Sequence, residues 1–233
     1  HLLLLDEPWA QLDDHGVSEL LTVLRDLSAE GMALVLVEHN AAAFTDIINH
    51  YWQLEAGRLS AGIYTVRDTP MHDEPTRYRG SASHQGKVLV SAEAFDFCFD
   101  GCQPLFRCPQ GFQLHAGEIV ALVGANGSGK TSLLKLLMRF DDPTLGLITL
   151  GKVPLTSVPT AELARFFAYV PQDPLIFTGT IASNIRIGNP DADDQAVDKA
   201  ARQVALDEVL DRSELGIYQE VGLQGAGLSG GER

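Results

Sequence analysis

The sequence has few cysteines, few basic residues and no long apolar run. Its 233 residues include 3 cysteines and 17 basic against 31 acidic residues. Cys98, Cys102 and Cys108 form no recurring framework and have no histidine at ligand spacing, which indicates reduced thiols rather than a metal site. The formal charge of −14 argues against a nucleic-acid-binding surface, which would carry basic stripes. No apolar run approaches the roughly 20 residues that span a bilayer.

The content of hydrophobic residues, 45%, is high enough for a packed core and excludes a disordered chain. No signal peptide is visible. The chain starts at His1 within a strand-like run and ends at Arg233 within a glycine-rich motif. We therefore interpret the sequence as an excerpt of a longer protein.

Residues 1–58 alternate between strand and helix patterns. The apolar runs 2–5 and 33–37 are typical of strands buried on both faces of a parallel sheet. Between them, apolar residues recur at helical spacing from Val17 to Leu27, and Gly31 is a plausible helix stop. The order strand–helix–strand predicts a parallel crossover.

Residues 59–87 are rich in proline, glycine and serine and show no sustained period, which predicts a linker. The pattern of secondary structure begins again at residue 88. Residues 119–123 form a buried strand pattern that runs into a glycine loop and then a helix over 131–140. Strands near 147–150 and 168–170 and helical residues near 194–210 are expected after it.

The segment GANGSGKT, residues 124–131, matches the phosphate-loop pattern G-x-x-x-x-G-K-[ST]. Its glycines let backbone N–H groups converge on phosphate oxygens, and the following helix presents its positive end to the same anion. Lys130 can reach the β- and γ-phosphates, and Thr131 can hold Mg²⁺. The structural alternative is a plain glycine turn, which the strand–loop–helix context disfavours. The predicted phosphate and nucleotide contacts in this segment and directly after it are Gly124, Asn126, Gly127, Ser128, Gly129, Lys130, Thr131 and Ser132.

The segment LLLLDEP, residues 2–8, brings two carboxylates to the end of a buried strand, where ligands gather in parallel sheets. Asp6 is expected to coordinate Mg²⁺ through water, and Glu7 to polarise the attacking water. By itself such an acidic pair is commonplace, and its structural alternative is a helix N-cap with a solvated neighbour.

Two further motifs depend on this context. His39, in LVEHN, follows a buried strand and is expected to contact the γ-phosphate, although a lone histidine there is more often structural. In LSGGER, Ser229 and the amides of Gly230 and Gly231 can bind a phosphate at a helix start, although the motif alone is a plain turn signal.

Together these motifs resemble the ATP-binding cassette (ABC) ATPase family. GANGSGKT resembles its Walker A motif, LLLLDEP its Walker B, AQLD at 10–13 its D-loop and LSGGER its signature. The resemblance implies that His39 is the switch histidine, that Gln172 is the Q-loop residue beside ATP and Mg²⁺, and that Phe99 stacks on adenine. It also implies ATP and Mg²⁺ as cofactors and Asp6, Thr131 and Gln172 as metal ligands. The implied fold is α/β: a P-loop NTPase core with a mainly parallel sheet, an antiparallel β subdomain and a partial helical subdomain.

The order of the motifs departs from that of a single cassette, because Walker B, the D-loop and the histidine come first. Residues 1–58 therefore resemble the end of a first cassette, residues 59–87 a linker and residues 88–233 the start of a second cassette. The first part is similar to energy-coupling-factor importer ATPases and the second to exporter cassettes, so the direction of transport stays open.

The expected function is ATP hydrolysis by a tandem ABC ATPase that energises a membrane transporter. The implied partners are transmembrane subunits or domains and a second cassette, at the cytoplasmic face of the cell membrane. One alternative is a soluble tandem protein that acts on ribosomes or nucleic acid, which the short linker and the acidic chain disfavour. Another, for this chain alone, is nucleotide binding without turnover.

The two apolar strands of residues 1–58 need neighbours. We therefore predict a circularly permuted cassette in which residues 2–5 share a sheet with residues 119–123, bringing Asp6, Glu7, Gln172 and His39 around Lys130. The alternative is two half-domains that do not pack together.

Overall fold

The computed structural model describes residues 1–9, 12, 14–38, 44–66, 76–79, 86–98, 104–204 and 206–228. It divides into two compact units. We call residues 1–7 and 25–171 the sheet unit, and residues 8–24 and 172–233 the helical unit. Within the sheet unit, strands from residues 1–58 pair with strands from residues 88–233.

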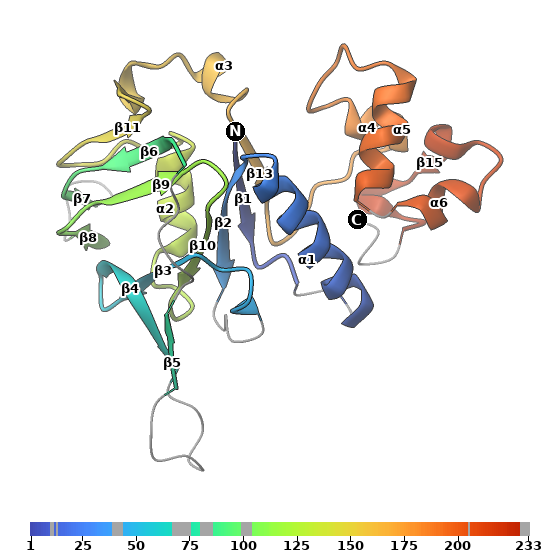
Figure 1. Cartoon of the computed structure of the whole chain (residues 1–233). Helices are drawn as coiled ribbons and strands as arrows, with labels where there is room; N and C mark the ends of the chain where they lie inside the picture. The colour runs from blue at the N-terminus through green and yellow to red at the C-terminus, as the bar shows by residue number, and fades with distance from the viewer. Residues whose placement is uncertain are drawn as a thin grey trace. The chain divides into compact units, whose positions relative to one another are not determined.

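The main sheet has strands in the order β13-β1-β2-β10-β3-β4-β8-β7, with β5 paired to β4. The strands from β13 to β3 are parallel to their neighbours, and β4 is antiparallel to β3. Figure 1 shows β1, β2 and β10 side by side. The strand bounds are β1 Leu2–Asp6, β2 Ala33–Glu38, β3 His50–Glu55, β4 Arg58–Val66, β5 Thr76–Arg79, β7 Phe95–Phe97, β8 Phe106–Cys108, β10 Ile119–Val123 and β13 Phe167–Val170.

The prediction that residues 2–5 share a sheet with residues 119–123 is confirmed. β1 and β10 lie in one sheet with β2 between them, and every residue of β2 and β10 is buried. Strands with apolar side chains on both faces need cover on both faces and a partner on each side. The alternative of two half-domains that do not pack together is therefore wrong for this chain.

The predicted linker, residues 59–87, contains regular structure. β4 runs on to Val66, and β5 pairs with it. Leu59 pairs with Leu54 across the β3–β4 hairpin and is buried with it. The prolines and glycines that predict a linker lie mainly outside these two strands.

The second sheet is antiparallel, in the order β12-β11-β6-β9. Its apolar residues, such as Val90, Leu114 and Ile148, join the core that also holds α2 and the main sheet. The bounds are β6 Val88–Ala92, β9 Phe112–His115, β11 Ile148–Leu150, β12 Val153–Pro154, α2 Lys130–Leu137, the short helix η2 Leu155–Ser157 and α3 Thr160–Leu163.

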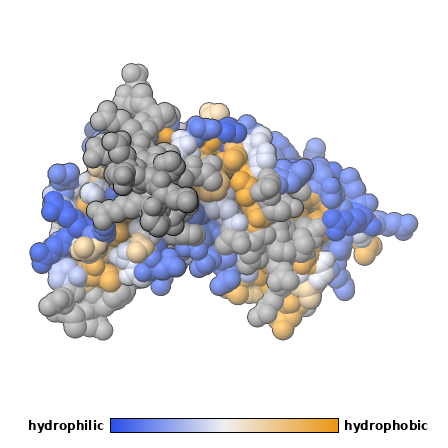
Figure 2. Space-filling view, turned by 90° about the horizontal axis from the view of Figure 1, so that it is seen from below, coloured by the Kyte–Doolittle hydropathy of each residue, from blue (hydrophilic) through white to orange (hydrophobic). Residues whose placement is uncertain are grey.

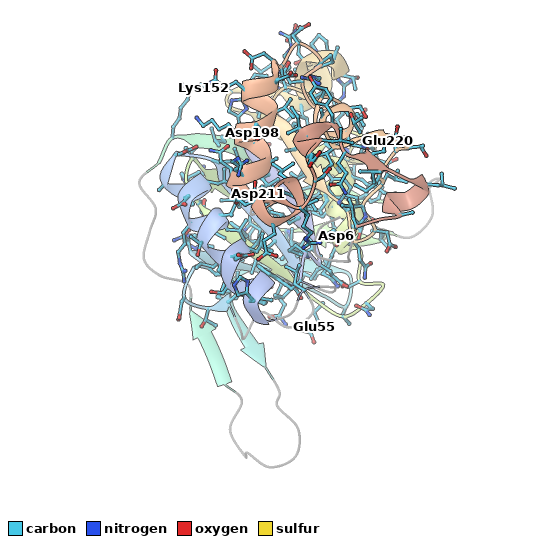
Figure 3. The ribbon with its side chains drawn as sticks, turned by 90° about the vertical axis from the view of Figure 1, so that its right-hand side faces the viewer. Asp6, Glu55, Lys152, Asp198, Asp211 and Glu220 are labelled. Carbon is cyan, nitrogen blue, oxygen red and sulfur yellow. The ribbon has the colours of Figure 1, made fainter. Side chains whose placement is uncertain are left out.

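The helical unit has a separate small core, which includes Ile181, Val197 and Leu210. Thr180 and Ser183 form a capping box at the start of α4. Figure 3 labels Asp198 and Asp211, from α5 and α6, whose carboxylates both contact the Arg202 guanidinium. The bounds are β14 Gly179–Thr180, α4 Ile181–Ile185, α5 Asp194–Gln203, α6 Asp207–Asp211, η3 Gly216–Tyr218, β15 Glu220–Val221 and η4 Leu223–Gly225; α1, Asp14–Ala29, is divided between the units.

The architecture confirms the predicted fold class: a largely parallel core, an antiparallel subdomain and a helical part. None of the helices formed by the described residues combines the length and apolar character needed to cross a membrane. Figure 2 shows hydrophobic and hydrophilic surface interspersed on one face of the molecule. In the helical unit, Leu175, Phe177 and Ile187 are large apolar side chains that are exposed.

Candidate functional site

The loop between β10 and α2 has the geometry of a phosphate loop. It runs from Gly124 to Gly129, between a fully buried strand and a helix that begins at Lys130. Gly129 has a φ of 104°, which L side chains rarely adopt, and a Cβ there would lie 3.2 Å from the Phe106 ring. The sequence therefore requires glycine at this turn into the helix.

Gly124 lets two segments approach closely at the start of the loop. A Cβ on this residue would lie 2.4 Å from the carbonyl oxygen of Leu54 and 2.8 Å from Oγ of Ser128. The Ser128 oxygen is buried and has no hydrogen-bond partner among the described residues. A polar atom buried in this way is costly unless a ligand or water satisfies it.

Lys130 is the first residue of α2 and is buried. Its ammonium group donates to the carbonyl oxygens of Gly124, at 2.8 Å, and Ala125, at 3.1 Å, and so lies across the loop. Burial lowers the pKa of this ammonium, while the charges of Glu7, Asp6 and Glu38 act in the opposite direction. The ammonium is thus a desolvated cation on the phosphate loop, and a desolvated cation attracts an anion more strongly than an exposed one does.

Asp6 ends β1 at the same edge of the sheet and is buried (Figure 3). Its Oδ2 accepts a hydrogen bond from Oγ1 of Thr131 at 2.9 Å and one from the Tyr169 hydroxyl at 3.4 Å. Burial and the neighbouring Asp6 carboxylate raise the pKa of Tyr169, so the phenol keeps its proton and remains a donor.

Glu7 follows Asp6 in the left-handed region, with a φ of 50°. Its backbone N–H donates to the carbonyl oxygen of Val37 at 3.1 Å. This bond ties the turn after β1 to the end of β2. A left-handed non-glycine residue next to buried charges is the kind of backbone strain that clusters at functional sites.

The structure thus brings Asp6, Glu7, Lys130 and Thr131 together at the carboxyl edge of the parallel strands. Gln172 belongs to the helical unit, whereas these four residues belong to the sheet unit. His39, Phe99, Ser229, Gly230 and Gly231 lie outside the described residues. Of the other predicted loop residues, Asn126 and Gly127 are exposed, and Ser132 is half-buried on α2.

Sequence reasoning missed two residues at this edge. Glu38 is buried at the end of β2, and its charge acts on Lys130. Tyr169 reaches Asp6 from β13. Glu38 ends a buried strand as Asp6 does, and that signal could have identified it. The direction of the Tyr169 side chain depends on the pairing of β13 with β1, which no local pattern reveals.

A parallel sheet whose central strand leads through this loop into a helix defines a P-loop nucleotide-binding protein. A family described as "ABC transporter" matches residues 109–233, which is more than half of the chain. The chain therefore belongs to the ABC transporter family, as the motifs predicted.

The chain is similar to longer proteins of this family. It is 34% identical over 177 residues to an "ATP-dependent lipid A-core flippase" of Neisseria meningitidis, covering 74% of this chain and 27% of the relative. It is 35% identical over 186 residues to "Beta-(1-->2)glucan export ATP-binding/permease protein NdvA" of Rhodopseudomonas palustris, covering 77% of this chain and 29% of the relative.

A solved structure, "Structure of a bacterial Atm1-family ABC exporter with ATP bound", matches with a TM-score of 0.57 and 34% identity. The match covers 65% of this chain and 26% of that one. The chain thus spans about a quarter of the length of the relatives that it matches.

Proposed function

We propose that the chain binds ATP at the carboxyl edge of its sheet and hydrolyses it to energise membrane transport. The observation that carries the proposal is the buried Lys130 ammonium on the phosphate loop, beside a Thr131 hydroxyl that is bonded to Asp6. Both fit the phosphate end of a nucleotide.

The phosphates would take the place of the carbonyl oxygens that Lys130 now contacts. Gly124 and Gly129 leave the loop backbone without Cβ atoms at its two closest approaches. The buried Ser128 hydroxyl supplies a further donor. The N-terminal end of α2 adds the attraction of its free N–H groups for an anion.

The residues at this edge also fit Mg²⁺, which prefers oxygen ligands. Thr131 and Asp6 would hold the ion, Thr131 directly and Asp6 through water, and Gln172 is proposed as a third ligand. When bound, the ion would neutralise negative charge on the phosphate oxygens. In this chain Asp6 orients the Thr131 hydroxyl, and Tyr169 in turn donates to Asp6.

Glu7 is the proposed base that polarises the attacking water, and its backbone is fixed by the bond to Val37. His39 is the proposed contact to the γ-phosphate, and Phe99 the proposed support for adenine. Ser229, Gly230 and Gly231 would contribute to the ATP site of a second cassette.

Transport is proposed from the similar proteins, whose names include a flippase, an export protein and a multidrug transporter. Those names support export for the cassette to which residues 88–233 belong. The proposed partners are transmembrane domains and a second cassette at the cytoplasmic face of the membrane. Leu175 and Phe177 are exposed apolar side chains shortly after Gln172, and they are proposed to contact these partners.

In the intact protein, residues 1–58 and 88–233 are proposed to belong to two successive cassettes, since their motifs stand in the order of an end followed by a beginning. Asp6, Glu7 and His39 would then serve the first ATP site there, and Lys130 and Thr131 the second, so the combined site is proposed for this chain alone. No observation favours the alternative that the protein acts on ribosomes or nucleic acid, and the charge of −14 opposes it.

The test is a titration of the purified chain with a fluorescent ATP analogue in the presence of Mg²⁺. Saturable binding that unlabelled ATP reverses is the expected result. A chain whose circular dichroism shows a folded α/β protein, but which shows no saturable binding, would contradict the proposal.

A further inference from the structure

The phosphate loop is contacted at both ends by residues that belong to none of the predicted motifs. At its start, a Cβ on Gly124 would come within 2.4 Å of the carbonyl oxygen of Leu54. At its end, a Cβ on Gly129 would lie 3.2 Å from Cδ1 of Phe106 and 3.4 Å from Cδ2 of Leu105. Because both loop residues are glycines, no side chain of the loop separates its backbone from these contacts.

The two sets of contacts belong to one connected piece of the sheet, residues 54–58 and 105–107, which we call the loop frame. Within it, Arg58 of β4 pairs with Arg107 of β8. The Arg107 N–H also donates to the carbonyl oxygen of Gly57, between β3 and β4, at 2.8 Å. Backbone contacts thus fix the two segments of the frame to one another, so the frame holds the two ends of the loop at one separation.

Phe106 is the side chain of the loop frame that packs most closely with other rings. It is 0% exposed. Its ring centroid lies 6.0 Å from that of Phe95, edge to face, and 5.8 Å from that of Phe97. A ring packed in this way has little room to move. Since it has no exposed surface, it cannot touch a bound nucleotide, and any effect on binding must act through Gly129.

We propose that Phe106 is a positioning residue for the phosphate loop, whose ring holds Gly129 where the loop presents its backbone N–H groups to phosphate. Glycine has more backbone freedom than any other residue, and Gly129, with a φ of 104°, has no side chain of its own to fix it. Its carbonyl oxygen accepts from the Leu133 N–H at 3.0 Å, so a shift of Gly129 also moves the start of α2. The consequence for phosphate affinity rests on the proposed function, whereas the consequence for loop motion does not.

The experiment compares Phe106→Leu with Phe112→Leu, the matched control. Both residues are buried phenylalanines of the same hydrophobic core, but Phe112 lies on β9 of the antiparallel sheet and packs against Trp52, with ring centroids 4.3 Å apart. Competition with a fluorescent ATP analogue in Mg²⁺ gives the affinities for ATP and for inorganic tripolyphosphate. Hydrogen–deuterium exchange of the nucleotide-free chain reports on peptides that cover residues 124–134. Urea denaturation establishes that each variant is folded and how stable it is.

Phe106→Leu should weaken the binding of ATP and of tripolyphosphate by the same factor, at least about fivefold, because the loss lies at the phosphate-binding backbone. Amide exchange over residues 124–134 should become at least about tenfold faster, since the hydrogen-bonded N–H groups there, such as those of Ser128 and Leu133, open more often. Phe112→Leu should change each affinity by less than about twofold and leave this exchange unchanged, even where it lowers stability to the same extent.

Any of three results would overturn the inference: unchanged tripolyphosphate affinity in Phe106→Leu, unchanged exchange over residues 124–134, or equal effects of Phe112→Leu. A loss confined to ATP falls under the first, because it would place the effect at the nucleoside. Phe106→Met, with a flexible unbranched side chain, replaces Phe106→Leu if the latter does not fold. Wild-type chain that binds neither ligand would refute the proposed function, and exchange in the nucleotide-free chain would then decide the role of Phe106 by itself.

Discussion

Carboxylates are buried at both edges of the parallel sheet, but the groups that surround them differ. At the amino edge, Glu118 is 2% exposed. Its Oε2 accepts from the backbone N–H of His115 at 2.7 Å and lies 3.0 Å from that ring's Nδ1, while Oε1 lies 3.4 Å from Nε2 of His50. This carboxylate closes the turn into β10 and ties it to β9 and β3.

At the carboxyl edge, Asp6 and Glu38 are buried around one lysine, next to a buried serine hydroxyl with no partner among the described residues. The contrast teaches how a structural acid differs from a functional one. A buried acid whose hydrogen bonds close a local turn stabilises the fold. A buried ammonium beside an unsatisfied hydroxyl, on a loop with phosphate-binding geometry, indicates a ligand.

The largest expected effect is that of Glu7→Gln on turnover. If Glu7 polarises the attacking water, the loss of its charge should slow phosphate release by about 100-fold or more. ATP affinity should stay within about threefold of the wild type, because the amide keeps the size of the side chain. Phosphate release and equilibrium binding of the analogue measure the two quantities. Glu55→Gln is the control, since Glu55 is an exposed acid at the end of β3, and normal turnover in Glu7→Gln would remove Glu7 from the catalytic role.

Lys130→Ala should weaken ATP binding by tenfold or more, about 1.4 kcal/mol or above. The variant removes the desolvated cation of the carboxyl edge and leaves its carboxylates. Lys135→Ala is the matched control, because Lys135 is on the same helix but exposed. Titration with the fluorescent analogue compares the two, and equal affinities would exclude the phosphate-loop assignment.

Glu118→Gln should lower stability and leave ATP affinity unchanged, in contrast to the variants of the carboxyl edge. It weakens the contacts of the acid with His115 and His50 and should lower the free energy of unfolding by about 1 kcal/mol. ATP affinity should not change. Urea denaturation and the binding titration together test this, and a loss of affinity with unchanged stability would contradict the assignment of the two edges.

Tyr169→Phe should have the smallest effect. The bond from Tyr169 to Asp6 is 3.4 Å long, against 2.9 Å for the bond from Thr131. Its removal should change Mg²⁺-dependent ATP affinity by less than about threefold, since a long hydrogen bond contributes little. The Thr131→Ala variant, measured in the same titration, should lose more. The reverse ranking would show that Tyr169, rather than Thr131, is the main partner of Asp6.

The phosphate loop could be predicted from the sequence because its chemistry is local. Residues 124–131 contain the glycines, the lysine and the hydroxyl in one segment, and the apolar strand before it fixes the context. The strands 2–5 and 33–37 were equally clear, since an unbroken apolar run predicts burial on both faces. The motifs also indicated the ABC transporter family, which residues 109–233 confirm.

The local sequence could not reveal the continuation of regular structure beyond residue 58. β4 and β5 are stabilised by pairing with neighbours, and the prolines and glycines that favour a linker lie mainly outside them. Strand propensity depends on such neighbours more than helix propensity does.

What the sequence by itself determined is which segments carry charge, glycine and apolar runs, and these define the loop, the buried strands and the family. The sequence also predicted that residues 2–5 and 119–123 share a sheet, but only the tertiary structure decided the order of the strands and which side chains meet. Asp6 and Thr131 are separated by 125 positions but hydrogen-bonded, and Glu38 acts on Lys130 from another strand. The reason is that strand order and register are set by the joint burial of all the strands, so the distances between charges at the sheet's edge belong to the sheet as a whole.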